Sequence, residues 1–421
     1  MGRRSMRKAF ASTMLGLSML GMASLPAAAK GTIKIGYVDP LSGGGASIGQ
    51  LGLNQLQFIA DAVNAKGGVL GRQVEIVPYD NKLDPQVSLV QVQKAIDQGV
   101  RIITQGTGSA VAAAIEDFVA KYNERNPGQG VVYLNYAAID PILTNQKCSY
   151  WHFSWDANVD IKMEALTNFI KPRKSIKKIY VIDQDYSYGH SIADTVVRML
   201  KAKRPDIQIV GNEFHPLLKV TDFSPYIAKI KASGADTVIT GDWGQDLALM
   251  IKAAGDAGLQ VNWYTNYAGG PGGPTAIKQA NLPNRVVQLT EGCNNLAYKP
   301  AQDTARAYIA RYKSEPAFYP RLFNEMGMLF TAIREANSTD PVKFAPKLEG
   351  MKYATFSSGE EGFMRKKDHQ FFQPLYISVF GPRGSNEPFD EEGTGWGWKQ
   401  VAQIPVKDTI FPTTCKMKRP N

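Results

Sequence analysis

The turn Thr107-Gly108-Ser109 holds the clearest chemical signal in the sequence. It follows an apolar segment that ends at Ile103 and precedes residues 110–122, whose composition predicts a helix. A strand, a turn of small residues and a helix start leave backbone N–H groups without partners, and the helix dipole adds positive potential there. Thr107 and Ser109 can add hydroxyl donors. The turn therefore predicts a site for an anion such as a carboxylate, and the alternative is simple capping of the helix by Ser109.

Residue types that usually carry catalysis are few and unpaired in this sequence. The four histidines (His152, His190, His215 and His369) form no metal-binding pair, and neither a nucleophile elbow nor a phosphate-binding loop is present. The segment 106–108 begins like a dinucleotide fingerprint but lacks its third glycine. The sequence thus predicts a protein that is not an enzyme and uses no metal and no cofactor. An extracellular hydrolase or lyase of unknown type is the alternative.

Residues 1–29 have the three parts of a secretory signal peptide. A basic start (residues 3–8) precedes an apolar run (residues 9–25) and a small-residue end at Ala29. We expect cleavage near Ala29, and the absence of a cysteine there argues against a lipid anchor. No later stretch reaches the ~20 apolar residues that span a bilayer. The mature protein is therefore expected free in the periplasm.

Chain length, net charge and cysteine content limit the classes of protein to which this sequence can belong. A chain of 421 residues suits two domains, and 44% hydrophobic residues supply two cores. The net charge of +10 includes four basic residues of the leader, and the other basic residues are spread along the chain, so no nucleic-acid partner is expected. Three cysteines (Cys148, Cys293 and Cys415) allow at most one internal disulfide, and the sequence leaves the pairing open.

Apolar patterning predicts an α/β protein with two similar units. Strand-like and helix-like segments alternate from residue 32, and the alternation restarts after about residue 150. Such alternation is typical of parallel sheets wrapped by helices. Residues 304–337 read as a long helical stretch. The tail from about 381 is rich in glycine, proline and tryptophan, and we expect it to be an irregular extension packed on the surface.

Six separated motifs carry a family resemblance that spans roughly residues 31 to 380. They occupy residues 35–43, 64–71, 79–85, 185–189, 222–227 and 234–236. In these motifs the sequence resembles the type I periplasmic binding proteins, in particular the branched-chain amino acid (Leu/Ile/Val) group. The resemblance implies the two-lobed Venus-flytrap fold, in which each lobe is a mainly parallel sheet flanked by helices.

The resemblance also implies a domain plan and partners. Three hinge crossings are expected, near 148–155, 290–296 and 353–362. Lobe 1 would comprise 30–150 plus 293–355, and lobe 2 would comprise 151–292 plus 356–421. A small-molecule ligand would bind in the cleft of a monomer, which would then deliver it to an inner-membrane ABC permease and its ATPase. A ligand sensor with the same fold is the alternative.

Residues of the first lobe correspond to the part of the cleft that holds a ligand carboxylate in relatives. The turn at Thr107 and the backbone around Tyr136 and Ala137 match these positions. Ile139 stands where relatives place a Ser or Thr hydroxyl. One polar contact is therefore missing, and we expect a more apolar pocket.

Residues of the second lobe correspond to aromatic positions of the family's cleft. Trp243 and Tyr188 match such positions, and Trp155 matches more loosely. Tyr267 stands where amino-acid binders carry the Glu that pairs with the ligand's ammonium. A buried ammonium without a counter-charge costs several kcal/mol. We therefore predict a small carboxylate or amide-type solute, either amino acid-like or an aromatic acid.

Two alternatives keep an ordinary amino acid as the ligand. Asp242 or Glu325 could replace the missing acid. The protein could also be a true branched-chain amino acid binder despite Tyr267.

Overall fold

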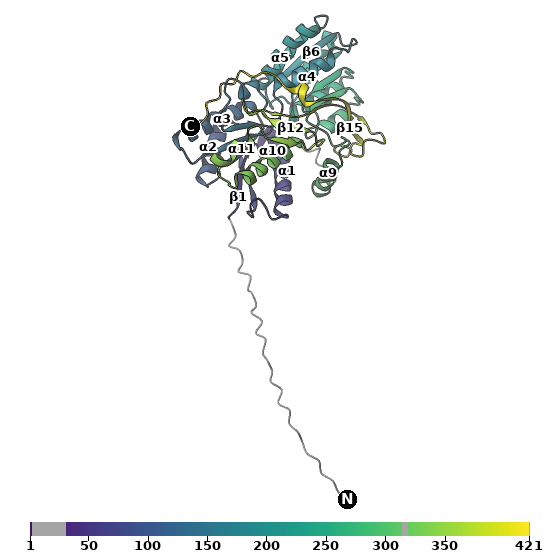
Figure 1. The fold of residues 1–421 in the computed structure, drawn as a ribbon. Coiled ribbons are helices and arrows are strands. Elements are labelled where there is room, and N and C mark those ends of the chain that lie inside the picture. Colours follow the sequence, from purple (N-terminus) through teal and green to yellow (C-terminus); the bar gives the residue numbers. More distant parts are fainter. Residues whose placement is uncertain (2–30, 314–318, 421) are drawn as a thin grey trace.

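The computed structural model describes Met1, residues 31–313 and residues 319–420 (Figure 1). The predicted signal peptide, with its cleavage near Ala29, lies outside the described residues apart from Met1. Over the described ranges, no helix has both the length and the apolar character needed to cross a membrane.

The first lobe is built on a parallel sheet with the order β2-β1-β3-β4-β5. Its strands are β1 (Ile33–Asp39), β2 (Val74–Asp80), β3 (Ile102–Gln105), β4 (Val132–Asn135) and β5 (His152–Ser154). Helices α1 (Ala46–Asn64), α2 (Pro85–Asp97), α3 (Ser109–Arg125), α9 (Lys299–Tyr312), α10 (Pro320–Ala336) and α11 (Pro341–Leu348) belong to this lobe. The predicted helical stretch 304–337 thus contains two helices. Leu53, Leu56 and Ala60 of α1 are buried and Val63 is half-buried, because their steps of three and four residues place them on one face of the helix.

The second lobe is built on a seven-stranded sheet with the order β15-β14-β10-β9-β8-β6-β7. Strands β6 (Lys178–Gln184), β7 (Gln208–His215), β8 (Thr237–Thr240), β9 (Asn262–Thr265) and β10 (Val286–Thr290) are parallel. Strands β14 (Leu375–Pro382) and β15 (Trp396–Ile404) complete it in antiparallel fashion. Helices α4 (Val159–Ile170), α5 (Ser187–Lys203), α6 (Ser224–Ser233), α7 (Gly244–Asp256) and α8 (Gly273–Gln279) flank it. The two-lobed α/β fold predicted from the sequence is confirmed.

A small third sheet lies where the chain returns to the second lobe. It contains β11 (Lys352–Ala354), β12 (Glu361–Met364) and β13 (Phe371–Phe372). A bridge from Gln370 to Ser154 attaches it to the edge of the first lobe's sheet. Residues 352–372 therefore contribute this small sheet before the chain enters β14 of the second lobe.

The C-terminal tail differs from the irregular surface extension expected from about residue 381. Residues 396–404 form β15, whose Trp396 and Trp398 are buried near Phe380, so burial of the tryptophans fixes this part as a strand. The connection from 383 to 395 is irregular, and so are residues 410–420, which follow the short helix α12 (Val406–Thr409).

The end of the tail returns to the first lobe, although the sequence placed it in lobe 2. Thr413 donates to the carbonyl of Thr144 at 2.8 Å. A disulfide joins Cys415 to Cys148, which answers the pairing question, and Cys293 is a free thiol. The tail therefore ties the two lobes together outside the three crossings.

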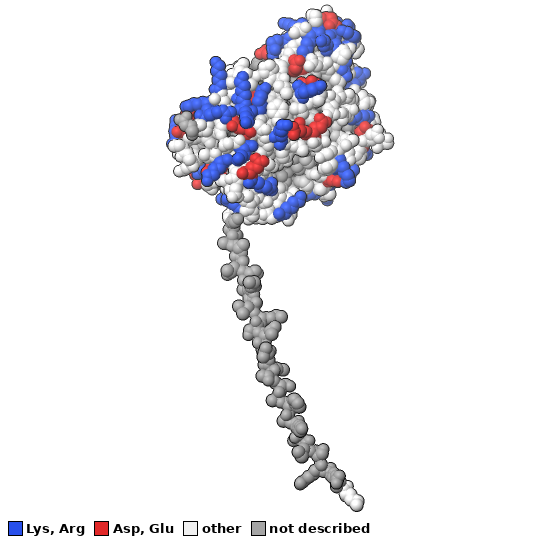
Figure 2. Space-filling model, in the orientation of Figure 1, with Lys and Arg blue, Asp and Glu red and all other residues white. Residues whose placement is uncertain are grey.

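Charged side chains of both signs cover both lobes. On the face shown in Figure 2, acidic residues lie between the lysines and arginines. This distribution matches the even spread of basic residues along the sequence.

Candidate functional site

One cavity lies between the lobes, at the carboxyl ends of strands from both sheets. Its walls come from the segments after β3 and β4 in the first lobe and after β8, β9 and β10 in the second. Ligands of open α/β sheets bind at this edge. The cavity encloses about 80 Å³. Because one water needs about 10–15 Å³, the space suits a small solute.

The cavity brings together nine of the ten residues that the sequence analysis assigned to the ligand-binding cleft. Its lining includes Thr107, Gly108, Ser109, Tyr136, Ala137, Ile139, Tyr188, Trp243 and Tyr267. The exception is Trp155, which is fully buried and belongs to the first lobe's core. Its indole Nε1–H donates to the sulfur of Met328 on α10 at 3.2 Å. The assignment of Trp155 to the cleft is wrong because its ring points between the sheet and α10.

The turn after β3 is partly occupied by a carboxylate of the protein itself. Asp39, at the end of β1, accepts from the backbone N–H of Thr107 at 3.0 Å and of Gly106 at 3.4 Å. The hydroxyl of Tyr136 donates to the same carboxylate at 2.5 Å. Burial raises the pKa of Asp39 to about 6, and the hydrogen bonds from Tyr136 and Thr107 oppose that rise. Sequence reasoning treated these two N–H groups as free for a ligand, and they are not.

The first turn of α3, after Thr107, has backbone N–H groups that the Asp39 carboxylate does not reach. Gly108 is the N-cap with φ of 91°, a conformation that favours glycine, and no side chain caps the helix. Ser109 is the first helical residue, and its Oγ accepts from the N–H of Asp140 at 3.3 Å. The alternative in which Ser109 caps the helix is therefore wrong. The N–H groups of the first helical turn have no intrahelical partner and carry the positive end of the helix dipole.

Aromatic side chains form the wall on the second lobe. The indole N–H of Trp243 donates to the Tyr186 hydroxyl at 2.9 Å, and the Tyr188 hydroxyl donates to the carbonyl of Gly241 at 3.1 Å. These bonds satisfy the polar ends of the rings. Ile48 and Ile139 of the first lobe share a buried apolar cluster with Tyr188 and Trp243. The wall is therefore apolar and continuous across the cleft.

Tyr267 spans the cleft. Its hydroxyl donates to a carboxylate oxygen of Asp156 at 2.9 Å and lies 3.5 Å from the carbonyl of Ala137 in the first lobe. Burial, followed by the charge of Asp156, raises the pKa of this phenol well above its usual range. At this position, where the family resemblance led us to expect an acid, the chain has a neutral hydrogen-bond donor.

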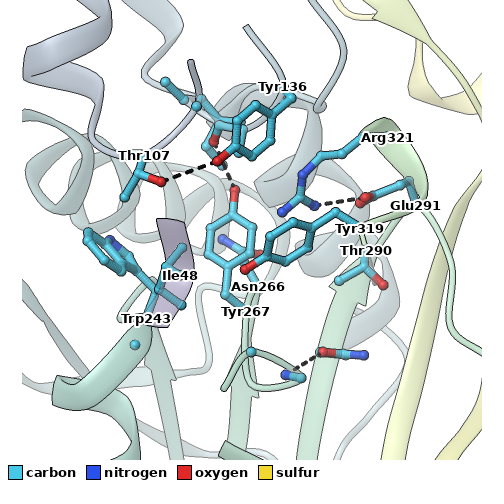
Figure 3. A pocket seen from close by; sticks show the side chains of 18 of the residues that line it. Ile48, Thr107, Tyr136, Trp243, Asn266, Tyr267, Thr290, Glu291, Tyr319 and Arg321 are labelled. Carbon is cyan, nitrogen blue, oxygen red and sulfur yellow. Dashed lines mark hydrogen bonds and ion pairs between the residues drawn. The ribbon is translucent and has the colours of Figure 1, made fainter. Parts of the chain in front are cut away.

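A buried ion pair lines the cavity and was missed by the sequence analysis. Arg321, in the first turn of α10, lies 2.8 Å from an oxygen of Glu291, which directly follows β10 (Figure 3). Asp156 lies 3.5 Å from the same guanidinium and 2.8 Å from the ammonium of buried Lys162. Neighbouring Glu291 and Asp156 raise the pKa of Arg321 against the effect of burial.

These charges could not be paired from sequence because they lie far apart along the chain. One signal was available. Glu291 follows a strand end of the second sheet, as Trp243 and Tyr267 do, and that position alone places it at the binding edge.

The two acids proposed as replacements for the missing Glu do not line the cavity. Asp242 is fully buried and lies 2.6 Å from Nε2 of His215. Glu325 is fully buried and accepts from the hydroxyl of Thr104 at 2.6 Å, and burial raises its pKa to about 8. The alternative in which either acid faces the ligand is wrong. Within the described part of the chain, no group of three or more His, Cys, Asp or Glu side chains could hold a metal ion.

Comparisons with known proteins agree with this geometry. The family profile described as periplasmic binding protein matches residues 32–384. The Leu/Ile/Val-binding protein homolog 4 of Brucella abortus is 31% identical over 430 residues, covering 98% of this chain and 99% of that protein. The solved closed conformation of a leucine-, isoleucine-, valine-, threonine- and alanine-binding protein from Brucella ovis has 31% identity and a TM-score of 0.81. It covers 92% of this chain and 100% of the other.

A more distant structure is similar in fold alone. The solute-binding protein of an ABC transporter from R. palustris, solved in complex with benzoate, has 15% identity and a TM-score of 0.76. The match covers 91% of this chain and 99% of that one.

Proposed function

The chain belongs to the periplasmic binding protein family, in its type I branched-chain amino acid group, and we propose that it is the substrate-binding component of an ABC importer. It is exported to the periplasm, where it captures a small carboxylate or amide-type solute as a monomer. It then presents the solute to an inner-membrane permease and its ATPase, without catalysing a reaction. The observation that carries this proposal is the cavity between the lobes, lined by strand-end residues of both sheets.

Hinge closure is the mechanism. Solute docks first at the α3 end of the first lobe, through the Thr107 hydroxyl and the free N–H groups of the helix. The second lobe then closes, and Tyr267 reaches the first lobe while Trp243 covers the apolar part of the solute. Closure removes water from the site and strengthens each polar contact. The contact of Tyr267 with Ala137 and the apolar cluster shared across the cleft support a closed state of this kind.

The proposed solute class is supported by the residues that line the cavity and by what similar proteins bind. Ile139, Trp243 and the tyrosines favour a solute with an apolar body, and Tyr267 supplies no charge. One similar structure holds benzoate, and other relatives are named for aliphatic amino acids. A sensor of the same fold would bind the same solutes, and loss of solute uptake on deletion of the gene would identify an importer.

A thermal-shift screen against amino acids, aromatic acids and amides tests the proposal. A ligand that binds only the folded state increases the free energy of unfolding by about 2.7 kcal/mol at 100 times its Kd. The melting temperature rises as a consequence. Calorimetry then compares the hit on wild type and Thr107→Val, which removes one hydroxyl at the docking end. We expect about tenfold weaker binding, the effect of one hydrogen bond.

Thr331→Val is the matched control, because the Thr331 hydroxyl donates only to the carbonyl of Gly327 within α10. Its affinity should equal that of wild type. A screen without any hit, or equal affinities for Thr107→Val and wild type, would contradict the proposed site.

A further inference from the structure

We propose that the C-terminal tail is a strap that limits how far the two lobes can open, and that the Cys148–Cys415 disulfide is its covalent anchor. The strap comprises residues 405–420. It restrains the solute-free protein whatever solute binds, so this inference does not rest on the proposed function. The family profile ends at residue 384, so the strap lies outside the part of the chain that matches the family.

The first end of the strap is fixed to the second lobe. It continues directly from β15, which is the edge strand of the second lobe's sheet. The short helix α12 packs against α4 of the same lobe. Val406 and Phe411 are partly buried against the apolar cluster that is built mainly from this lobe. The first end of the strap therefore moves with the second lobe.

The second end of the strap is fixed to the first lobe. Besides the hydrogen bond of Thr413 already described, the backbone N–H of Thr414 donates to the side-chain oxygen of Asn145 at 2.9 Å. Cys415 follows at once and is bonded to Cys148. The chain then ends beside α3 of the first lobe (Figure 1). The strap is thus a fourth link between the lobes, and its anchor on the first lobe is covalent.

The strap has almost no slack between its two ends. Only Pro412 separates Phe411 from Thr413, and two residue steps span at most about 7 Å. From Phe411 to Cys415 there are four steps, which span at most about 14 Å. The hydrogen bonds of Thr413 and Thr414 can break when the lobes rotate, but the disulfide cannot. The disulfide therefore sets an upper limit on the separation of the two ends.

This limit acts on opening because the lobes contact each other across the cleft in this structure. Tyr267 reaches the carbonyl of Ala137, and the hydroxyl of Ser191 on α5 donates to Asp140 at 3.3 Å. Once such contacts break, only rotations that keep the strap ends within reach are allowed. Release of the strap widens the range of open states. A narrow range lowers the entropy lost on closure, so the strap favours capture of a solute.

The free thiol of Cys293 reports opening, because this half-buried residue lines the cavity between the lobes. It is the only free thiol in the oxidised wild type and the only cysteine in Cys148→Ser/Cys415→Ser. The experiment measures the rate at which iodoacetamide alkylates solute-free mature protein, followed by intact mass. We expect the double variant to react about fivefold faster or more, because wider opening exposes the cavity more often.

A lengthened strap separates a limit on reach from a general loss of stability. Six Gly and Ser residues inserted between Pro412 and Thr413 keep the disulfide and add about 20 Å of reach. Loop-closure entropy depends on the logarithm of loop length, so the insertion leaves the effect of the disulfide on the unfolded chain almost unchanged. The insertion variant should react as fast as the double Ser variant, and it serves if the double variant fails to fold.

Lys418→Ala is the matched control. It removes an exposed ion pair between the strap and Glu124 of the first lobe, and it leaves both the disulfide and the length of the strap intact. Since exposed ion pairs contribute little, its alkylation rate should equal that of wild type. All rates are measured at a temperature where circular dichroism shows every variant folded.

Equal alkylation rates for wild type and the insertion variant would overturn the inference. Faster alkylation of the double Ser variant alone would overturn it as well, because the disulfide would then act through stability and not through the length of the strap. No solute takes part in this experiment, so either result leaves the proposed function untouched.

Discussion

Glu325 should make the stability of this protein fall as the pH rises. The carboxyl group is fully buried on α10, and burial raises its pKa from an ordinary 4.5 to about 8. The folded state therefore holds this proton to a higher pH than the unfolded chain does. Its stabilising contribution is complete below pH 4.5 and is lost as the pH rises through 8. Replacing Glu325 by Gln keeps an oxygen for the Thr104 hydroxyl and removes the titration.

The size of the effect follows from those two pKa values. Between pH 5 and pH 7 the wild type should lose about 2.5 kcal/mol of unfolding free energy that Glu325→Gln keeps, at 1.36 kcal/mol per unit of pKa. In thermal unfolding this corresponds to roughly 3 °C for a chain of this length. The measurement is urea and thermal unfolding of both proteins at pH 5, 6 and 7, followed by circular dichroism.

Glu335→Gln is the control for this experiment. Glu335 lies on the same helix but is exposed, so its variant should follow the pH dependence of wild type. Parallel curves for wild type and Glu325→Gln would refute the reasoning, because Glu325 would then be ionised at no cost in the folded protein.

Two further predictions concern the tail and the aromatic wall. The Cys148–Cys415 disulfide closes a separation of 267 residues, and its removal in the double Ser variant should cost about 5.6 kcal/mol by the chain-entropy relation. Urea unfolding with and without reductant measures this, and equal midpoints for the variant and oxidised wild type would disprove it. Trp243→Ala should weaken solute binding about tenfold or more, because it removes the wall and leaves the Tyr186 hydroxyl without its donor. Calorimetry showing unchanged affinity would exclude Trp243 from the site.

The outline of the site followed partly from local sequence and partly from the family resemblance. The strand, turn and helix pattern identified Thr107, the resemblance supplied Tyr188, Trp243 and Tyr267, and the structure places all four around one cavity. This worked because residues after parallel strands meet at a common edge whatever their distance in sequence. Trp155 also follows a strand, but its ring turns into the core, and side-chain direction at a strand end cannot be read from spacing.

The polar chemistry of the site did not follow from local sequence. Asp39 fills part of the turn after β3, although 68 residues separate it from Thr107. Arg321 and Glu291 form an ion pair although 30 residues separate them, and Asp156, which follows β5, lies 3.5 Å from the same guanidinium. Such pairs form only when distant segments pack, since a buried charge needs partners that no local pattern specifies.

The sequence by itself determined the alternation of strands and helices in two α/β units, because periodic apolar patterning is a local property repeated along the chain. Its six separated motifs carried the resemblance to the family. Only the tertiary structure decided that Cys148 pairs with Cys415, that the tail supplies a strand and returns to the first lobe, and that Asp39 satisfies donors thought to be free. It also decided that Glu291, held by Arg321, is the acid at the cavity. Each of these depends on which distant groups become neighbours when water is excluded, and that is a property of the packed chain.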